Sequence, residues 1–238
     1  MRLDRWLCTL GCGSRSEVQK LIRAGFAAVD GESCRDPGRP CAGTERLALR
    51  GETLDGRLER HVMLHKPAGL LTAARDRKQP TVMDLLPANF VSLGCMPVGR
   101  LDKDTTGLLL LTTDGELNHR LLAPARHVDK RYRVRTDGPL GAAEIGAFAA
   151  GIRLEEGIVT GEMEVLSSDG TGAEALLTIH EGKFHQVKRM YEAVGRRVVR
   201  LHRDRFGPLA LEEGLAEGHW RELTEAELSA LRQAAGLA

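Results

Sequence analysis

The chain has 238 residues, a length that favours one or two domains. Hydrophobic residues make up 42% and charged residues 28%, a balance that excludes a disordered or collagen-like chain. The longest aliphatic run, residues 108–111, is far shorter than the ~20 residues that span a bilayer. Five cysteines and no apolar segment near Met1 favour reduced thiols without a signal peptide, so we expect a cytoplasmic protein.

The charges are unevenly distributed along the chain, although its net charge is only +1. Residues 183–205 contain eight Lys and Arg against two acids, and residues 119–135 contain six against one. Residues 137–181 reverse the balance, with nine acids and a single arginine. This segregation indicates one basic and one acidic face, and a basic face on a neutral protein is typical of binding to a polyanion, nucleic acid first.

The first 50 residues predict two small helices and a hairpin. Ser14 and Glu17 have the spacing of a capping box, which begins a helix that ends near Arg23. An apolar stripe precedes this helix, and residues 26–29 read as a strand that enters a tight turn. The polar residues 51–60 are interpreted as a linker.

The remaining residues, 61–238, predict one larger domain. Its strands and helices alternate without a regular βαβ rhythm, so the α+β class is favoured, with a mixed, mostly antiparallel sheet. Strands are predicted at 62–64, 108–112, 131–135, 176–179 and 198–201, a short helix or turn at 81–86, and helices at 115–122, 184–195 and from 224 onward.

Two of these elements combine apolar and basic side chains. Tyr132 and Val134 alternate with arginines, which predicts a strand with one apolar and one basic face. The helix that ends at Gly195 is predicted to turn Phe184, together with Val187, Tyr191 and Val194, toward the core.

The segment with the clearest chemistry is residues 99–107, in which Asp102 follows an arginine in a loop before a buried strand. Such a carboxylate is a candidate nucleophile or base. Asp102, Asp104 and Thr106 also match the DxDxT pattern of phosphatases that form an aspartyl phosphate with Mg²⁺. The match is poor, because the residues before it are not a hydrophobic strand and no later acidic pair follows an apolar strand.

Four segments together resemble the RsuA family of ribosomal RNA pseudouridine synthases, in the order of that family and over nearly the whole chain. They are residues 65–69 (HKPAG), 99–108 (GRLDKDTTGL), 130–134 (KRYRV) and 181–190 (EGKFHQVKRM). The first 50 residues are similar to the S4-type RNA-binding domain of the same family. Thr106 and residues 118–120 are closer to the branch that modifies small-subunit rRNA.

This resemblance implies isomerisation of one uridine in 16S rRNA, with neither a cofactor nor a metal. Asp102 would be the catalytic carboxylate, either attacking the ribose or abstracting a proton from it. Lys188 would be its cationic partner, and Tyr132 would pack on the uracil. The base must be flipped out of its stack at a cost of a few kcal/mol, and Arg100 would fill the vacated space.

Rows of cations are expected to hold phosphates without reading bases. The residues expected to bind RNA are Arg100, Arg2, Arg5, Arg15, Lys20, Arg23, Arg131, Arg133, Lys183, Gln186 and Arg189.

Several alternatives stay open at this point. The same reaction on 23S rRNA is one, and a non-catalytic rRNA-binding assembly factor is another. The spacing of Cys8, Cys12, Cys34 and Cys41 fits a zinc site poorly. No exposed apolar stripe requires a second subunit, so a monomer is expected.

Overall fold

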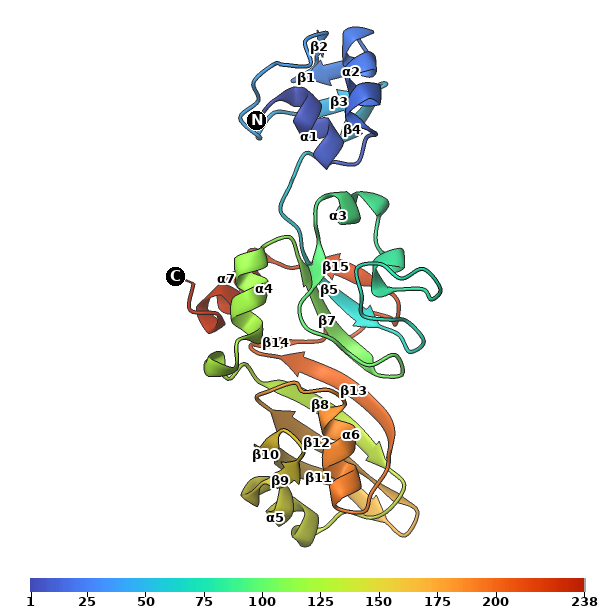
Figure 1. Cartoon of the computed structure of the whole chain (residues 1–238), viewed down its shortest axis with the longest axis vertical. Coiled ribbons are helices and arrows are strands. Elements are labelled where there is room, and N and C mark those ends of the chain that lie inside the picture. Colours follow the sequence, from blue (N-terminus) through green and yellow to red (C-terminus); the bar gives the residue numbers. More distant parts are fainter. Residues whose placement is uncertain (238) are drawn as a thin grey trace. The chain divides into compact units, whose positions relative to one another are not determined.

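The computed structural model describes residues 1–237 and divides into two compact units (Figure 1). The first unit contains Met1–Arg60 and Leu86–Met96, and the second contains His61–Leu85 and the chain from Pro97 onward. Within the described residues, every helix is too short or too polar to cross a membrane.

The first unit combines three helices with a small antiparallel sheet. The predicted capping box is present, since Glu17 accepts a hydrogen bond from the Ser14 N–H at 2.8 Å and its own N–H points at the Ser14 hydroxyl. Trp6 is fully buried in the core between the helices and the sheet. The helices are α1 (Leu3–Thr9), α2 (Arg15–Arg23) and α3 (Ala88–Ser92), and the sheet order is β2 (Glu32–Cys34), β1 (Ala27–Val29), β3 (Leu47–Leu49), β4 (Glu52–Leu54).

The structure differs from the expected linker at residues 51–60. Strand β4 lies within that segment and completes the first sheet. The Trp6 indole N–H donates to the carbonyl of Gly56 at 2.9 Å, and Arg60 is 3% exposed. A polar, glycine-containing segment looks like a linker in sequence, but here a buried indole requires a partner that the segment supplies. Helix α3 also joins this unit from a part of the chain that was assigned to the catalytic domain.

The second unit is built on one long mixed sheet, as predicted. Its pairs are antiparallel except β13 and β7, which run parallel, so the α+β class is confirmed. The strand order is β11 (Glu162–Asp169), β12 (Gly172–Ile179), β8 (Lys130–Thr136), β13 (Val198–Phe206), β7 (Thr106–Thr112), β5 (His61–Lys66) and β15 (Trp220–Glu222), with β14 (Leu209–Ala210) paired to β13. The short strands β6 (Met96–Pro97), β9 (Ile152–Leu154) and β10 (Gly157–Val159) complete the list.

Helices cover this sheet in two places. Helix α6 (Gln186–Ala193) contacts β13 and the short strand β9, and Figure 1 shows α4 (Gly115–Leu122) beside α7 (Glu225–Ala234). Apolar side chains of β7, α4 and α7 share a core that includes Leu108, Leu117 and Leu231. The other helical segments are η1 (Val82–Leu85), η2 (Pro124–Arg126) and α5 (Ala142–Ala150).

Candidate active site

The loop that carries Asp102 precedes β7, and a buried lysine holds its backbone in place. Lys66 is fully buried, and its ammonium donates to the carbonyls of Pro67 at 3.0 Å, Lys103 at 3.3 Å and Thr105 at 2.9 Å. Burial lowers the pKa of this lysine to about 8, although nearby carboxylates oppose the shift. Lys66 therefore holds the backbone on the carboxyl side of Asp102 in one shape.

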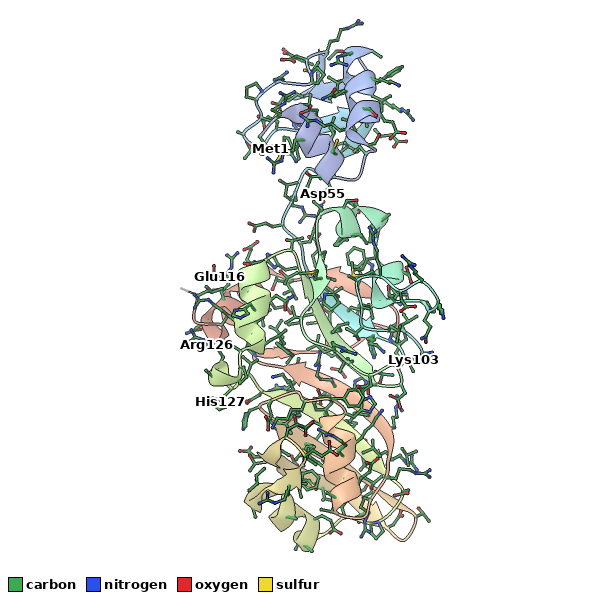
Figure 2. The ribbon with its side chains drawn as sticks, viewed as in Figure 1. Met1, Asp55, Lys103, Glu116, Arg126 and His127 are labelled. Carbon is green, nitrogen blue, oxygen red and sulfur yellow. The ribbon has the colours of Figure 1, made fainter. Side chains whose placement is uncertain are left out.

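A second set of hydrogen bonds fixes the same loop on its other side. The Thr72 hydroxyl donates to the carbonyl of Leu101 at 2.8 Å, and the Leu101 N–H lies 3.2 Å from that hydroxyl. The Gly69 N–H donates to the carbonyl of Lys103 at 2.7 Å. The segment after β5 is thus a backbone clamp on the Asp102 loop. In Figure 2, Lys103 marks the outer end of this loop.

Lys188, from α6, lies between two carboxylates of this loop. Its Nζ is 3.3 Å from Asp102 Oδ2 and 2.6 Å from Asp104 Oδ1. Partial burial lowers the pKa of Lys188, but the hydrogen bond to Asp104 and the charges of both aspartates outweigh it and raise that pKa above its ordinary value. The hydrogen bond from Lys188 lowers the pKa of Asp104. The lysine consequently stays charged next to the two carboxylates.

His185 approaches Asp102 from the turn that begins α6. Its Nε2 lies 3.5 Å from Asp102 Oδ1. The backbone of His185 has a φ of +48°, in the left-handed region that non-glycine residues seldom adopt. The Gln186 side chain stabilises this turn, since its Oε1 accepts from the Lys183 N–H at 2.9 Å.

The prediction that Phe184 points into the core is wrong. Its side chain is 69% exposed and stacks on the His185 ring, with 3.9 Å between the ring centroids. Helical periodicity placed Phe184 on the apolar face, but α6 begins only at Gln186, so Phe184 belongs to the preceding turn. The other predicted inward residues include Val187 and Tyr191, which are buried.

Asp102 and Tyr132 line the same two adjoining cavities. The smaller, of about 60 Å³, is also lined by Lys188 and Leu201, and the larger, of about 440 Å³, by Phe184. Tyr132 is 7% exposed, and its ring comes from the apolar face of β8. Arg100 contributes to both cavities. The structure thus brings together the three predicted catalytic residues and the arginine that was expected to support base flipping.

Of the other residues that we expected to bind RNA, Lys183 lines both cavities and Gln186 lines the smaller one, whereas the remaining cations line neither. Side chains alternate along a strand, so Arg131 and Arg133 face the side of β8 opposite to Tyr132. Most of these cations are paired with acids, namely Arg131 with Asp204, Arg133 with Glu174, Lys183 with Glu181, Arg189 with Glu156, and Arg2 and Arg15 with Asp4. Arg5, Lys20 and Arg23 are exposed on the first unit, whereas Gln186 is buried.

Sequence reasoning missed Asp104, His185 and Lys66 as parts of the site. Asp104 was considered only as a metal ligand of the phosphatase pattern, but it forms the shorter ion pair with Lys188. Lys66 lies in the HKPAG segment, which belongs to the family pattern. The sequence alone did not show that Lys66 contacts the Asp102 loop. Among residues 1–237, no three His, Cys, Asp or Glu side chains gather closely enough to hold a metal ion.

Comparison with known proteins defines the class of this enzyme. Residues 1–47 match the S4 domain model, and residues 60–193 match the RNA pseudouridylate synthase model. An S4 domain followed by this catalytic fold, with an aspartate–lysine pair beside a tyrosine, defines an RNA-modifying isomerase. The chain belongs to the RNA pseudouridylate synthase family, and its expected membership of the RsuA branch is confirmed.

Relatives match the chain over almost all of its length. It is 42% identical over 236 residues to an uncharacterized RNA pseudouridine synthase, YtzG, of Bacillus subtilis, covering 98% of this chain and 99% of the relative. It is also 42% identical to ribosomal small subunit pseudouridine synthase A of Pseudomonas aeruginosa, with 96% and 99% covered. A crystal structure of a pseudouridylate synthase aligns with a TM-score of 0.68 and 33% identity, covering 97% and 99% of the two chains.

Proposed function

We propose that this enzyme isomerises one uridine of 16S rRNA to pseudouridine, with Asp102 as the catalytic carboxylate. The observation that carries the proposal is the Lys188 ammonium 3.3 Å from Asp102, in a pocket that Tyr132 also lines. The small-subunit substrate is supported by the names of the relatives from Pseudomonas aeruginosa and Vibrio cholerae, which are 42% and 38% identical to this chain.

The reaction breaks the glycosidic bond, turns the uracil and rejoins it to the ribose through C5. It has no net redox change, and the hydrogen at C5 leaves as a proton. An ionised carboxylate beside the ribose is the group that this chemistry requires. Lys188 keeps Asp102 in place by a charge-assisted contact, and the Lys66 clamp fixes the backbone that presents it.

The aromatic ring of Tyr132 gives the pocket an apolar wall on which a uracil stacks. A uridine within a stacked stem reaches this wall only after it is flipped, at a cost of a few kcal/mol. Arg100 lines both cavities, and we propose that its guanidinium fills the gap that the flipped base leaves.

The S4 unit supplies a second binding surface for the RNA. Arg5, Lys20 and Arg23 are exposed there, and phosphate contacts of this kind fix register without selecting a sequence. Two linked binding units raise the effective concentration of the target at the pocket. We place the enzyme in the cytoplasm, as a monomer acting on rRNA or on a partly assembled small subunit.

The direct test is release of tritium from rRNA labelled at uridine C5, because forming the new carbon–carbon bond expels that hydrogen. We expect the wild-type enzyme to release tritium from small-subunit rRNA, bare or partly assembled, and not from large-subunit rRNA. Release from large-subunit rRNA alone would keep the chemistry and overturn the proposed substrate. Tight, salt-dependent binding of both forms without release would favour a non-catalytic assembly factor.

A further inference from the structure

The larger cavity beside Asp102 has more room and more positive charge than the reacting uracil requires. Its volume is about 440 Å³, against about 60 Å³ for the smaller cavity that Lys188 lines. A water molecule needs about 10–15 Å³ on this scale, so the smaller cavity holds only a few waters. The target uridine therefore takes up part of the larger cavity, which Asp102 and Tyr132 also line, and the remaining volume has room for a second ligand. The two cavities share Arg100, Asp102 and Tyr132, so a ligand in the larger one lies next to the reaction centre.

Phe184 stands at this cavity in a position that folding alone does not explain. A single exposed apolar side chain is common on protein surfaces, but Phe184 combines its exposure with a stacked neighbouring ring and a place in the cavity lining. Phe184 is 69% exposed, and its ring lies nearly parallel to His185, with an interplanar angle of 17°. The left-handed backbone of His185 keeps the turn in this conformation, and unusual backbone conformations cluster at functional sites. The result is a flat aromatic surface at the edge of the cavity.

The inner wall of the same cavity carries buried cations without acidic partners. Arg203 is 2% exposed, and its Nε donates to the carbonyl of Leu108 at 2.8 Å, while its Nη2 has no hydrogen-bond partner among the described residues. Lys130 is 7% exposed and donates to the carbonyls of Val128 and His180. Both cations lie over the Phe206 ring, and neither forms an ion pair within the described chain. Four cations (Arg100, Lys130, Lys183 and Arg203) line the cavity against two carboxylates (Asp102 and Glu181), so its net charge is suited to an anionic ligand.

We propose that this cavity binds a second nucleotide of the RNA, next to the target uridine in the chain, with its base stacked on Phe184. The buried positive charge of Arg203 and Lys130, with Lys183 at the rim, attracts the nucleotide's phosphate. Stacking on an aromatic ring accepts any base, so this contact contributes affinity and register and does not read sequence. The proposal rests on the proposed function, because it names a further part of the same RNA substrate.

The test combines variants of Phe184 with RNA fragments that lack one base. Fragments of small-subunit rRNA spanning the mapped target are prepared intact, with an abasic residue 5′ of the target, and with one 3′ of it. The proteins are wild type, Phe184→Ala, Phe184→Trp and the matched control Ile158→Ala, which removes an apolar side chain that is 60% exposed and lies outside the cavity. Dissociation constants and tritium release are measured for each combination.

We expect Phe184→Ala to weaken binding of the intact fragment by about tenfold, within the range that base–aromatic stacking contributes. One of the abasic fragments should weaken wild-type binding to a similar extent and leave Phe184→Ala unaffected. Phe184→Trp should retain binding, and Ile158→Ala should behave as wild type. If Phe184 had only a structural role, the effect of replacing it would not depend on the presence of one particular base.

Two results would overturn the proposal. The first is that Phe184→Ala binds the intact fragment with wild-type affinity. The second is that each abasic residue weakens binding by Phe184→Ala as much as it weakens binding by wild type. The failure of the proposed function is separate from either, because it appears as no tritium release from the intact fragment by wild type. In that case, coupling in the dissociation constants would still establish the nucleotide site.

Discussion

Lys188 contacts both aspartates of the reactive loop. Replacing it with alanine leaves Asp102 and Asp104 close together without the cation between them, so the reactive carboxylate loses its position. A displacement of about 1 Å in an active site can cost about 100-fold in rate, and we expect a loss of that size in kcat for Lys188→Ala. Single-turnover tritium release measures it.

Arg196→Ala is the matched control for this experiment. Arg196 lies just beyond the same helix, but its guanidinium pairs with Glu144 and the carbonyl of Pro139, outside both cavities. We expect its kcat to stay within a few-fold of wild type. Equal losses for the two variants would reduce Lys188 to a contact with the RNA backbone.

Lys66 predicts a pH dependence of stability. Its pKa is about 8 in the folded protein, below the ordinary 10.5, so between these values the unfolded chain binds one more proton than the folded one. The contribution of Lys66 to the free energy of unfolding is therefore complete above pH 10.5 and is lost as the pH falls toward 8. The free energy of unfolding changes through this group by at most about 1.4 kcal/mol per pH unit.

Urea unfolding of wild type and Lys66→Met across this range isolates the effect. The difference in free energy of unfolding, wild type minus variant, should rise with pH above 8 and stay constant below it. Lys66→Met should be less stable throughout, because three buried carbonyls lose their donor. A difference independent of pH would show that Lys66 has an ordinary pKa.

At the scale of elements, the parallel pair β7 and β13 depends on one glycine. Gly107 has a φ of +108°, and a Cβ at this position would lie 2.2 Å from the Arg203 carbonyl oxygen. Gly107→Ala should therefore force the strands apart and cost at least about 1–3 kcal/mol of stability. Activity should fall with it, since β7 follows the Asp102 loop directly.

Gly115→Ala provides the comparison, since nothing lies within 4 Å of a Cβ there. At the start of α4, alanine should leave the midpoint of urea unfolding unchanged or raise it slightly. If Gly107→Ala were as stable as Gly115→Ala, the close approach of β7 and β13 would be incorrect.

The elements that sequence predicted best are those with a local physical signal. The capping box at Ser14, the predicted helix from residue 224 and the alternation around Tyr132 all correspond to observed helices and strands. The error at Phe184 arose because helical periodicity was extended two residues beyond the start of α6. Side-chain direction in a left-handed turn depends on the bonds of Gln186, which spacing does not reveal.

The site itself was predictable only as far as the family pattern reached. Asp102, Tyr132 and Lys188 could be named from their motifs. The roles of Lys66 and Asp104 depend on contacts between segments 37 or more residues apart, as for the Lys66 bond to Lys103 and the Lys188 bond to Asp104, 84 residues apart. Such long-range contacts carry no signature in a single sequence.

At the scale of the whole molecule, the S4 unit should account for part of the salt dependence of RNA binding. Deleting residues 1–50 would remove the partners of β4 and of α3, so neutral substitutions are the sharper test. Replacing Arg5, Lys20 and Arg23 with glutamine removes three exposed cations and leaves the core intact.

Each phosphate contact contributes about 0.9 to the slope of log K against log salt concentration on duplex DNA, and about 0.7 on single strands. The triple variant should therefore show a flatter slope by about 2–3, with weaker binding at low salt. Titrations of labelled rRNA over a range of salt concentrations measure this slope. A slope equal to that of wild type would mean that these side chains do not contact RNA.

The most direct test of the central claim is tritium release from C5-labelled small-subunit rRNA by wild type and Asp102→Asn, with RNA affinity measured in parallel. The asparagine keeps the shape of the side chain and removes its charge. We predict no release by Asp102→Asn with affinity within a few-fold of wild type, while Asp104→Asn, which lies outside both cavities, keeps measurable release. Release by Asp102→Asn at the wild-type rate would remove Asp102 from the chemistry and contradict the assignment of this pocket as the active site.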